Sequence, residues 1–340
     1  MMNNSELLNN SQKAGKWSAL VERNRKSEGY YFKNKLGMFV FKFFRAVMLF
    51  GLCFVILQPI FNKLSVSFMV EADLYDSTVI NIPRTFTTEN YRLAMELMNY
   101  KKALFDSTFC ALLVSVLQVF ACTLVGYGFA RFKFPFKKFW FACVILAIIV
   151  PPQTYMSSIY LHFRFFDIFG IINAISGAPI NMINKTISYL LLVTTCMGLK
   201  SGLYIFLIRQ FFRGVPKELE EAAYLDGCGN LQTFVRVMIP AAKPILVSCF
   251  LFAFVWQWTD SFYSGMFLRH KTLLTSALTA MTDRLNDYSV RTYGQGFLPS
   301  IAYSQMMTST GILLAIAPLL IIYIIAQKGF VESISQSGLK

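Results

Sequence analysis

The sequence of 340 residues is poor in charged side chains, which make up 15% of it, whereas a typical soluble domain contains about 25%. Hydrophobic residues make up 55%, and the mean hydropathy is +0.50. So little charge beside so much apolar sequence excludes an ordinary water-soluble domain. The composition predicts an integral membrane protein.

Histidine is also scarce, and the cysteines lack metal-binding spacing. His162 and His270 are the only histidines and lie far apart in the sequence, and none of the seven cysteines forms a CxxC pair. Most of the cysteines fall inside apolar runs, where a thiol behaves as a small hydrophobic side chain. We therefore expect no metal site and no disulfide framework.

Acidic residues are outnumbered by basic ones, 18 to 32, which gives a net charge of +14. Such an excess could indicate nucleic acid or anionic lipid as a partner. A nucleic-acid-binding protein presents a soluble basic face with stacking aromatics, whereas these basic residues lie beside apolar runs. We expect membrane lipid and no nucleic acid as a partner. An interfacial segment on anionic headgroups would explain KNKLGMFVFKFFR (33–45), and simple anchoring would do nearly as well.

Six apolar segments are long enough to cross a bilayer, which takes roughly 20 mostly apolar residues. They are 44–70, 108–129, 139–161, 187–208, 245–267 and 308–326. Several contain Pro or Gly, which membrane helices tolerate when neighbours satisfy the freed backbone groups. The sequence therefore predicts an all-α membrane protein with six transmembrane helices and both termini on one side.

Lysine and arginine predict the orientation of these spans, because cytoplasmic loops carry an excess of them. With a cytoplasmic N-terminus, the inside segments, counted through Arg45 at the start of the first span, hold 20 basic residues and the outside loops 10, while Lys63 and Lys200 lie deeper within spans. We therefore expect both termini in the cytoplasm. The chain then divides into a basic cytoplasmic extension (1–43), which lacks the features of a signal peptide, and a transmembrane domain (44–340) with a long cytoplasmic loop at 209–243.

The loop 209–243 carries the signals of two short helices joined by a glycine bend. Pro216 suits a first helical turn, and the acidic residues after it suit the positive end of the helix dipole. Gly227 can supply a left-handed stop, and Asn230 is a plausible N-cap for the second helix. Apolar residues recur at helical spacing in both halves: Val215, Leu219, Ala222 and Ala223, then Leu231, Phe234, Val235 and Met238. We expect the second stripe to end before Pro240.

Such a charged helical pair outside the membrane has two physical interpretations. Its small alanines and its carboxylates could dock a cytoplasmic protein in a fixed orientation. An amphipathic loop could equally lie on the lipid or pack on its own helical bundle. The residues alone favour neither interpretation over the other.

The stretch EAAYLDG, followed by nine residues and VMIP, resembles the EAA signature of binding-protein-dependent ABC importer permeases, EAA-x3-G-x9-I-x-L-P. Val237 and Ile239 stand where Ile and Leu are usual. The resemblance implies the bundle of an ABC importer type I permease, in which this loop is the coupling helix seated in a cleft of the ATP-hydrolysing subunit. The positions that carry over are Glu221, Ala222, Ala223, Asp226, Gly227 and Pro240.

The similarity covers 44–340 and extends to the maltose-type carbohydrate permeases, on stretches such as VLQVFACTLVGYGFARFKFP (116–135). The sequence WTD at 258–260 departs from the Trp-Asn-Asp that is common there. The resemblance implies import of a carbohydrate, in particular an oligosaccharide, across a bacterial inner membrane. The ending 329–340 is also similar to this subfamily, whose tails reach toward the ATPase dimer, so the resemblance implies a secondary contact at 330–340.

The resemblance also implies three partners: a cytoplasmic ATPase dimer, a second homologous permease subunit and an extracytoplasmic solute-binding protein. The chain contains no P-loop motif GxxxxGK[ST]. We therefore expect a permease that is not itself an enzyme and binds no cofactor, with ATP and Mg²⁺ bound by the ATPase.

Polar side chains inside the spans are candidates for the solute path, because exposing them to lipid would be costly. Amide and aromatic groups also suit the binding of sugars. The candidates are Gln118, Gln153, Gln257, Trp258 and Asp260. Hydrogen bonding between helices explains each of them at least as well. The Pro-Pro break at 151–152 could widen a cavity beside Gln153, or be only a kink.

Three alternatives remain, one within the permease family and two from other classes. A permease for another solute, such as glycerol phosphate or a polyamine, would share the coupling loop. An ion-coupled secondary transporter would need intramembrane carboxylates or inverted repeats, and the spans contain almost no acids and no convincing repeat. A membrane scaffold or receptor would not need the EAA signature.

Overall fold

The computed structural model describes residues 25–26 and 30–337. Most of the predicted extension 1–43 and the last three residues of the predicted ATPase-contacting tail therefore lie outside the described residues. The chain divides into two units, 1–63 and 64–340. Each is described by itself.

The first unit ends within helix α2 (Tyr30–Ser67), which continues into the second unit for its last four residues. Residues 33–67 of this helix are long and apolar enough to cross a membrane. The predicted span 44–70 thus begins well inside a longer helix. Pro59 lies inside the helix without ending it, as expected for a membrane helix.

The described residues of the second unit are helical, apart from turns, loops and one isolated bridge between Phe166 and Ile180. This confirms the all-α class. The first half contains η1 (Glu71–Tyr75), α3 (Glu89–Leu97), α4 (Tyr100–Arg131), α5 (Lys137–Ile149), η2 (Pro152–Tyr155), α6 (Met156–Arg164), α7 (Ile171–Ser176), α8 (Thr186–Thr194) and α9 (Ser201–Gly214). The second half contains α10 (Glu218–Leu225), α11 (Asn230–Thr233), the π-helical turn η3 (Phe234–Met238), α12 (Ile239–Ala241), α13 (Lys243–Thr259), α14 (Phe262–Phe267), α15 (Leu274–Thr279), α16 (Met281–Tyr293) and α17 (Ile301–Ser337).

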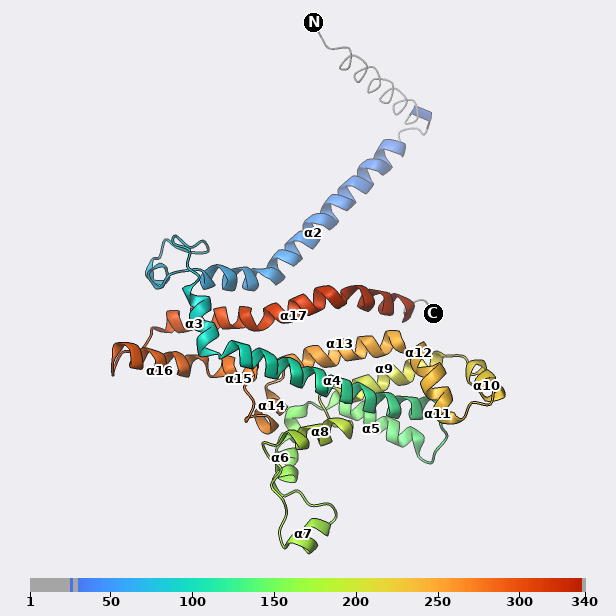
Figure 1. Ribbon diagram of the computed structural model, residues 1–340. Helices are drawn as coiled ribbons and strands as arrows, with labels where there is room; N and C mark the ends of the chain where they lie inside the picture. Colours follow the sequence, from blue (N-terminus) through green and yellow to red (C-terminus); the bar gives the residue numbers. More distant parts are fainter. Residues whose placement is uncertain (1–24, 27–29, 338–340) are drawn as a thin grey trace. The chain divides into compact units, whose positions relative to one another are not determined.

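Helix α4 lies at the centre of the second unit. It packs against α9 and α13, and α13 packs in turn against α17 (Figure 1). The approach of α4 to α9 is close at Gly126, where an added Cβ would lie 2.9 Å from Cγ2 of Ile208. Small residues at such contacts let membrane helices gain dispersion energy over a long interface.

Three of the six predicted spans are broken helices. In 139–161, α5 and the η2–α6 segment meet at an angle of 104°, because Pro151 and Pro152 lack the N–H groups that would continue the helix. In 187–208, α8 and α9 are separated by a connection in which Cys196 and Lys200 have left-handed backbone conformations. In 245–267, the chain breaks at Asp260.

The number of membrane crossings therefore stays a prediction. Among the described residues, three helices are each long and apolar enough to cross a membrane, and there are up to five if each of two bent pairs counts as one. Composition predicted where the apolar segments lie. It did not predict which of them are continuous.

Candidate functional site

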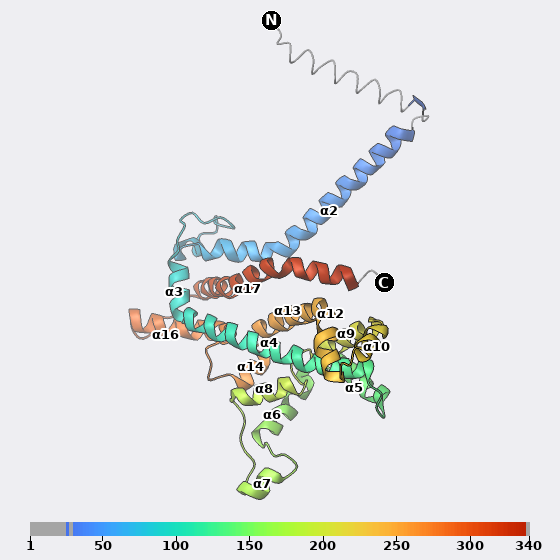
Figure 2. The ribbon, with the colours of Figure 1, turned by 45° about the vertical axis from the view of Figure 1, so that its right-hand side comes forward.

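The predicted loop 209–243 forms a bent helical element at one end of the second unit. Helices α10, α11 and α12 gather at this end, and α3 and α16 lie at the other (Figures 1 and 2). Gly227 follows α10 with a φ of +81°, which confirms the predicted left-handed stop. The bend therefore depends on the residue type that adopts this conformation at least cost.

Two local predictions in this loop are wrong. The N-cap of the second helix is Gly229, and Asn230 is its first helical residue. The Gly229 N–H donates to Oε1 of Gln232 at 3.3 Å. The helical backbone also continues past Pro240 to Ala241, because the proline occupies the first turn of α12, where its missing N–H is not needed.

The predicted apolar stripe of the second half is divided between two faces. Phe234 and Met238 are buried, whereas Leu231 and Val235 are 74% and 51% exposed. The turn from Phe234 to Met238 is π-helical, which changes the angular spacing of the side chains. The regular spacing that the sequence suggested is therefore lost here.

Helix α10 presents two different faces. Glu220 and Ala223 are buried, whereas Glu221, Ala222 and Asp226 are exposed. Leu225 is 89% exposed on the same short helix. A protruding leucine with carboxylates beside it has the anatomy of a protein-binding surface, an apolar anchor with a polar rim.

A buried ion pair fixes α10 to the end of α4. Oε2 of Glu220 lies 3.2 Å from Nε of Arg131, and both side chains are nearly buried. The hydroxyl of Tyr127 donates to Oε1 of Glu220 at 2.9 Å. Nη2 of Arg131 donates to the carbonyl oxygen of Val215 at 2.8 Å. We call Tyr127, Arg131 and Glu220 the α4–α10 cluster.

Aromatic packing supports this cluster. The ring of Tyr127 lies 5.2 Å from that of Phe212 and 4.7 Å from that of Phe234, between ring centroids. The cluster thus joins α4, α9, α10 and η3. The sequence analysis did not predict this cluster. A signal for it was present, because Glu220 and Ala223 are three residues apart and therefore lie on the same face of the helix.

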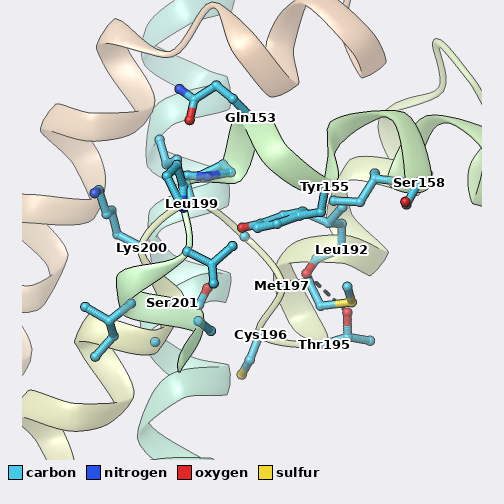
Figure 3. A pocket seen from close by; sticks show the side chains of 18 of the residues that line it. Gln153, Tyr155, Ser158, Leu192, Thr195, Cys196, Met197, Leu199, Lys200 and Ser201 are labelled. Carbon is cyan, nitrogen blue, oxygen red and sulfur yellow. Dashed lines mark hydrogen bonds between the residues drawn. The ribbon is translucent and has the colours of Figure 1, made fainter. Parts of the chain in front are cut away.

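A cavity of about 1250 Å³ opens where the helices break. Its walls come from the bend between α5 and α6, from the connection between α8 and α9, and from Trp256 of α13. Gln153, Tyr155 and Lys200 lie around it, with the hydroxyl end of Tyr155 directed toward the side where Lys200 lies (Figure 3). Pro151 and Pro152 also line it, so the predicted break does border a cavity.

The predicted path residues are not gathered in one place. Gln153 lines the cavity, and the other four do not. Nε2 of Gln118 donates to the carbonyl oxygen of Leu199 at 2.6 Å and to Oγ of Ser201 at 2.8 Å. Its side chain thus fixes the connection that forms one wall.

The remaining three candidates are buried and bonded to neighbouring groups. Gln257 accepts from the hydroxyl of Tyr189. Nε1 of Trp258 donates to the carbonyl oxygen of Ala315 at 3.1 Å. The carboxylate of Asp260 accepts from three successive backbone N–H groups, at 3.0, 3.2 and 2.8 Å, at the start of α14. Their role in a solute path stays a prediction.

Neither the loop nor the cavity contains a metal-binding cluster. Among the residues that the structure describes, no three His, Cys, Asp or Glu side chains gather as a metal site would require. The exposed surface of α10 offers an apolar side chain with carboxylates beside it, and the cavity offers amide, hydroxyl and ammonium groups on a largely apolar lining.

Comparison with known proteins places these features in context. Residues 122–336 match the family model of the binding-protein-dependent transport system inner membrane component. A probable ABC transporter permease protein of Pyrococcus horikoshii is 28% identical over 74% of this chain and 80% of its own length. The maltodextrin transport system permease protein MdxG of Bacillus subtilis is 26% identical over 72% of this chain and 80% of its own length.

A solved structure has the same fold. It is a chain from the crystal structure of a bacterial ABC transporter involved in the import of the acidic polysaccharide alginate. The TM-score is 0.63 and the identity 18%, over 85% of this chain and 96% of that one.

Proposed function

Because the chain belongs to the family of binding-protein-dependent transport system inner membrane components, we propose that it is one permease subunit of an ATP-driven importer for a carbohydrate. The exposed surface of α10 and of the bend after it carries this proposal, since Ala223 alone of the six signature positions is buried. The name of the maltodextrin relative supports a carbohydrate, an oligosaccharide in particular. Family membership decides against an ion-coupled secondary transporter.

The proposed mechanism couples a remote ATPase to the helical bundle. The ATPase dimer, which holds ATP and Mg²⁺, receives α10 in a cleft and moves it when ATP binding closes the dimer. The α4–α10 cluster transmits this displacement to α4, because a buried ion pair with a hydrogen bond on each side resists shear. The bundle is then biased between two states by a ligand that it does not itself bind.

The remaining parts of the importer follow from the same proposal. A second homologous permease subunit completes the pathway, and a solute-binding protein delivers the solute from outside. The membrane is the bacterial inner membrane, with 209–243 on its cytoplasmic side. The cavity beside Gln153 forms part of the solute path, and this chain needs no cofactor of its own.

The docking of α10 can be tested by changing its exposed face. Glu221→Lys and Leu225→Asp alter side chains that the fold of this chain does not bury. We expect each to lower the amount of ATPase that co-purifies with the chain by about tenfold or more, because interface anchors contribute about 2 kcal/mol or more. ATP hydrolysis stimulated by the loaded binding protein should fall in parallel.

Ile80→Asp is the matched control, because Ile80 is 77% exposed and lies in the η1–α3 connection, away from α10. It should leave ATPase co-purification unchanged. Normal assembly and hydrolysis in both α10 variants would refute the docking proposal. The carbohydrate assignment has its own test: a cognate binding protein specific for amino acids or metal ions would refute it and leave the importer assignment intact.

A further inference from the structure

Lys200 places a positive charge inside a predicted membrane span. It belongs to the apolar segment 187–208 and lies in the connection between α8 and α9. Ionisable side chains at membrane depth are costly, and they are retained where they face a cavity and contact a solute or an ion. Lys200 is exposed and lines the cavity described above.

The backbone alone does not explain a lysine at this position. Lys200 has a φ of +62°, a left-handed conformation that glycine adopts at lower cost. Its carbonyl oxygen accepts the backbone N–H groups of Leu203 and Tyr204 at 3.0 and 3.3 Å, a bond that any residue could provide. The side chain must therefore account for the choice of lysine.

The ammonium group has an aromatic partner but no anionic one. Its Nζ lies 5.0 Å from the ring centroid of Trp256, which also lines the cavity. The lining contains no Asp or Glu, and its only other ionisable cation is His162. Across the described residues, no ion pair of Lys200 is found. The charge is therefore available to a ligand and makes the local potential positive.

From this arrangement we propose that Lys200 and Trp256 form a subsite for an anionic group of the solute, so that the imported carbohydrate is an acidic saccharide. The indole ring offers an apolar face for a sugar ring, and the ammonium group beside it can donate to a carboxylate. The inference rests on the proposed importer function and further specifies that the imported solute is negatively charged. It disfavours a polyamine, whose charge the lysine would repel.

Binding to the assembled transporter in lipid nanodiscs tests the subsite. The probes are trigalacturonate, which is an acidic saccharide, maltotriose as its neutral counterpart, glycerol 3-phosphate as a non-sugar anion, and spermidine. We expect trigalacturonate to bind the native transporter more tightly than the other three. Lys200→Gln should weaken that binding by about tenfold or more, the loss expected for a charge-assisted hydrogen bond.

Matched variants separate charge from fold. Lys200→Arg keeps the charge and should retain the preference for trigalacturonate. Lys185→Gln removes an exposed lysine that does not line the cavity and should change nothing. Trp256→Ala should weaken binding of both saccharides, because it removes the indole face on which a sugar ring of either one would stack.

Three results would overturn the acidic-saccharide assignment: equal affinity for the two saccharides, equal weakening of both by Lys200→Gln, or binding of neither. Tighter binding of glycerol 3-phosphate than of trigalacturonate would also overturn it, in favour of a non-sugar anion. None of these results touches the importer function itself, which the α10 variants test separately.

Discussion

Glu220 and Glu221 are neighbours of the same residue type with opposite environments. Glu220 is buried against Arg131 and Tyr127, and Glu221 is exposed in the EAA signature. A charge that is buried away from water needs a partner of opposite charge. Removing that partner is strongly destabilising, because it leaves the other charge buried and uncompensated. The buried residue therefore holds the helix, while the exposed one is available to another protein.

Glu220→Gln should destabilise the chain strongly. It leaves the buried guanidinium of Arg131 without a carboxylate, which costs about 3–5 kcal/mol for a buried pair. Thermal unfolding of the detergent-solubilised protein would measure the loss as a lower midpoint temperature. Glu218→Gln, at an exposed position of the same helix, is the control and should change the midpoint little.

The double variant Glu220→Gln with Arg131→Gln should recover part of the lost stability, because no unpaired charge remains. Losses that simply add in the double variant would contradict the ion pair as the source of the effect. Recovered stability with impaired ATP-driven uptake would further support the α4–α10 cluster as the transmitting contact.

At the scale of elements, a glycine allows α4 and α9 to pack closely against each other. An added Cβ at Gly126 would meet Cγ2 of Ile208 at 2.9 Å and the backbone nitrogen of Arg209 at 3.3 Å. At Gly128, two residues along the same helix, it would meet only Phe132, at 3.9 Å. Two glycines of one helix thus differ entirely in what surrounds them.

Gly126→Ala should therefore destabilise the protein and Gly128→Ala should not. Overpacking costs about 1–3 kcal/mol, whereas alanine in place of glycine in a helix gains up to about 1 kcal/mol. Thermal unfolding of the two variants side by side would show a lower midpoint for the first alone. Equal midpoints would mean that α4 and α9 are not in this close contact.

For the whole molecule, the distribution of basic residues predicts the orientation in the membrane. The segments assigned to the inside hold twice as many lysines and arginines as the outside loops, 20 against 10, and such an excess retains a loop in the cytoplasm. Both the proposed docking role of α10 and the proposed entry of solute from outside depend on this orientation.

Alkaline phosphatase fusions test it, because that enzyme is active only outside the cytoplasm. A fusion after Gly177 should be active, and fusions after Ala241 and after Lys340 should be inactive. A fluorescent protein that matures only in the cytoplasm should give the reverse pattern. Activity after Ala241 would place α10 outside and contradict the coupling proposal.

The sequence by itself determined the helical membrane class, the position of the apolar segments, and the family through the EAA signature. These properties follow from composition and from patterns within about 20 residues. Local chemistry was also sufficient for the bend at Gly227, which has the predicted left-handed conformation. It failed at Pro240, since a proline can begin a helical turn as well as end one.

Only the tertiary structure decided which neighbouring side chains point inward, where apolar segments break, and what the breaks enclose. The partners of Glu220 show the reason: Tyr127 lies 93 positions away in the chain, and no local pattern contains such a contact. Gln118 and Lys200 were both polar residues inside apolar runs. Packing placed Gln118 outside the cavity, bonded to Leu199 and Ser201, whereas Lys200 lines the cavity.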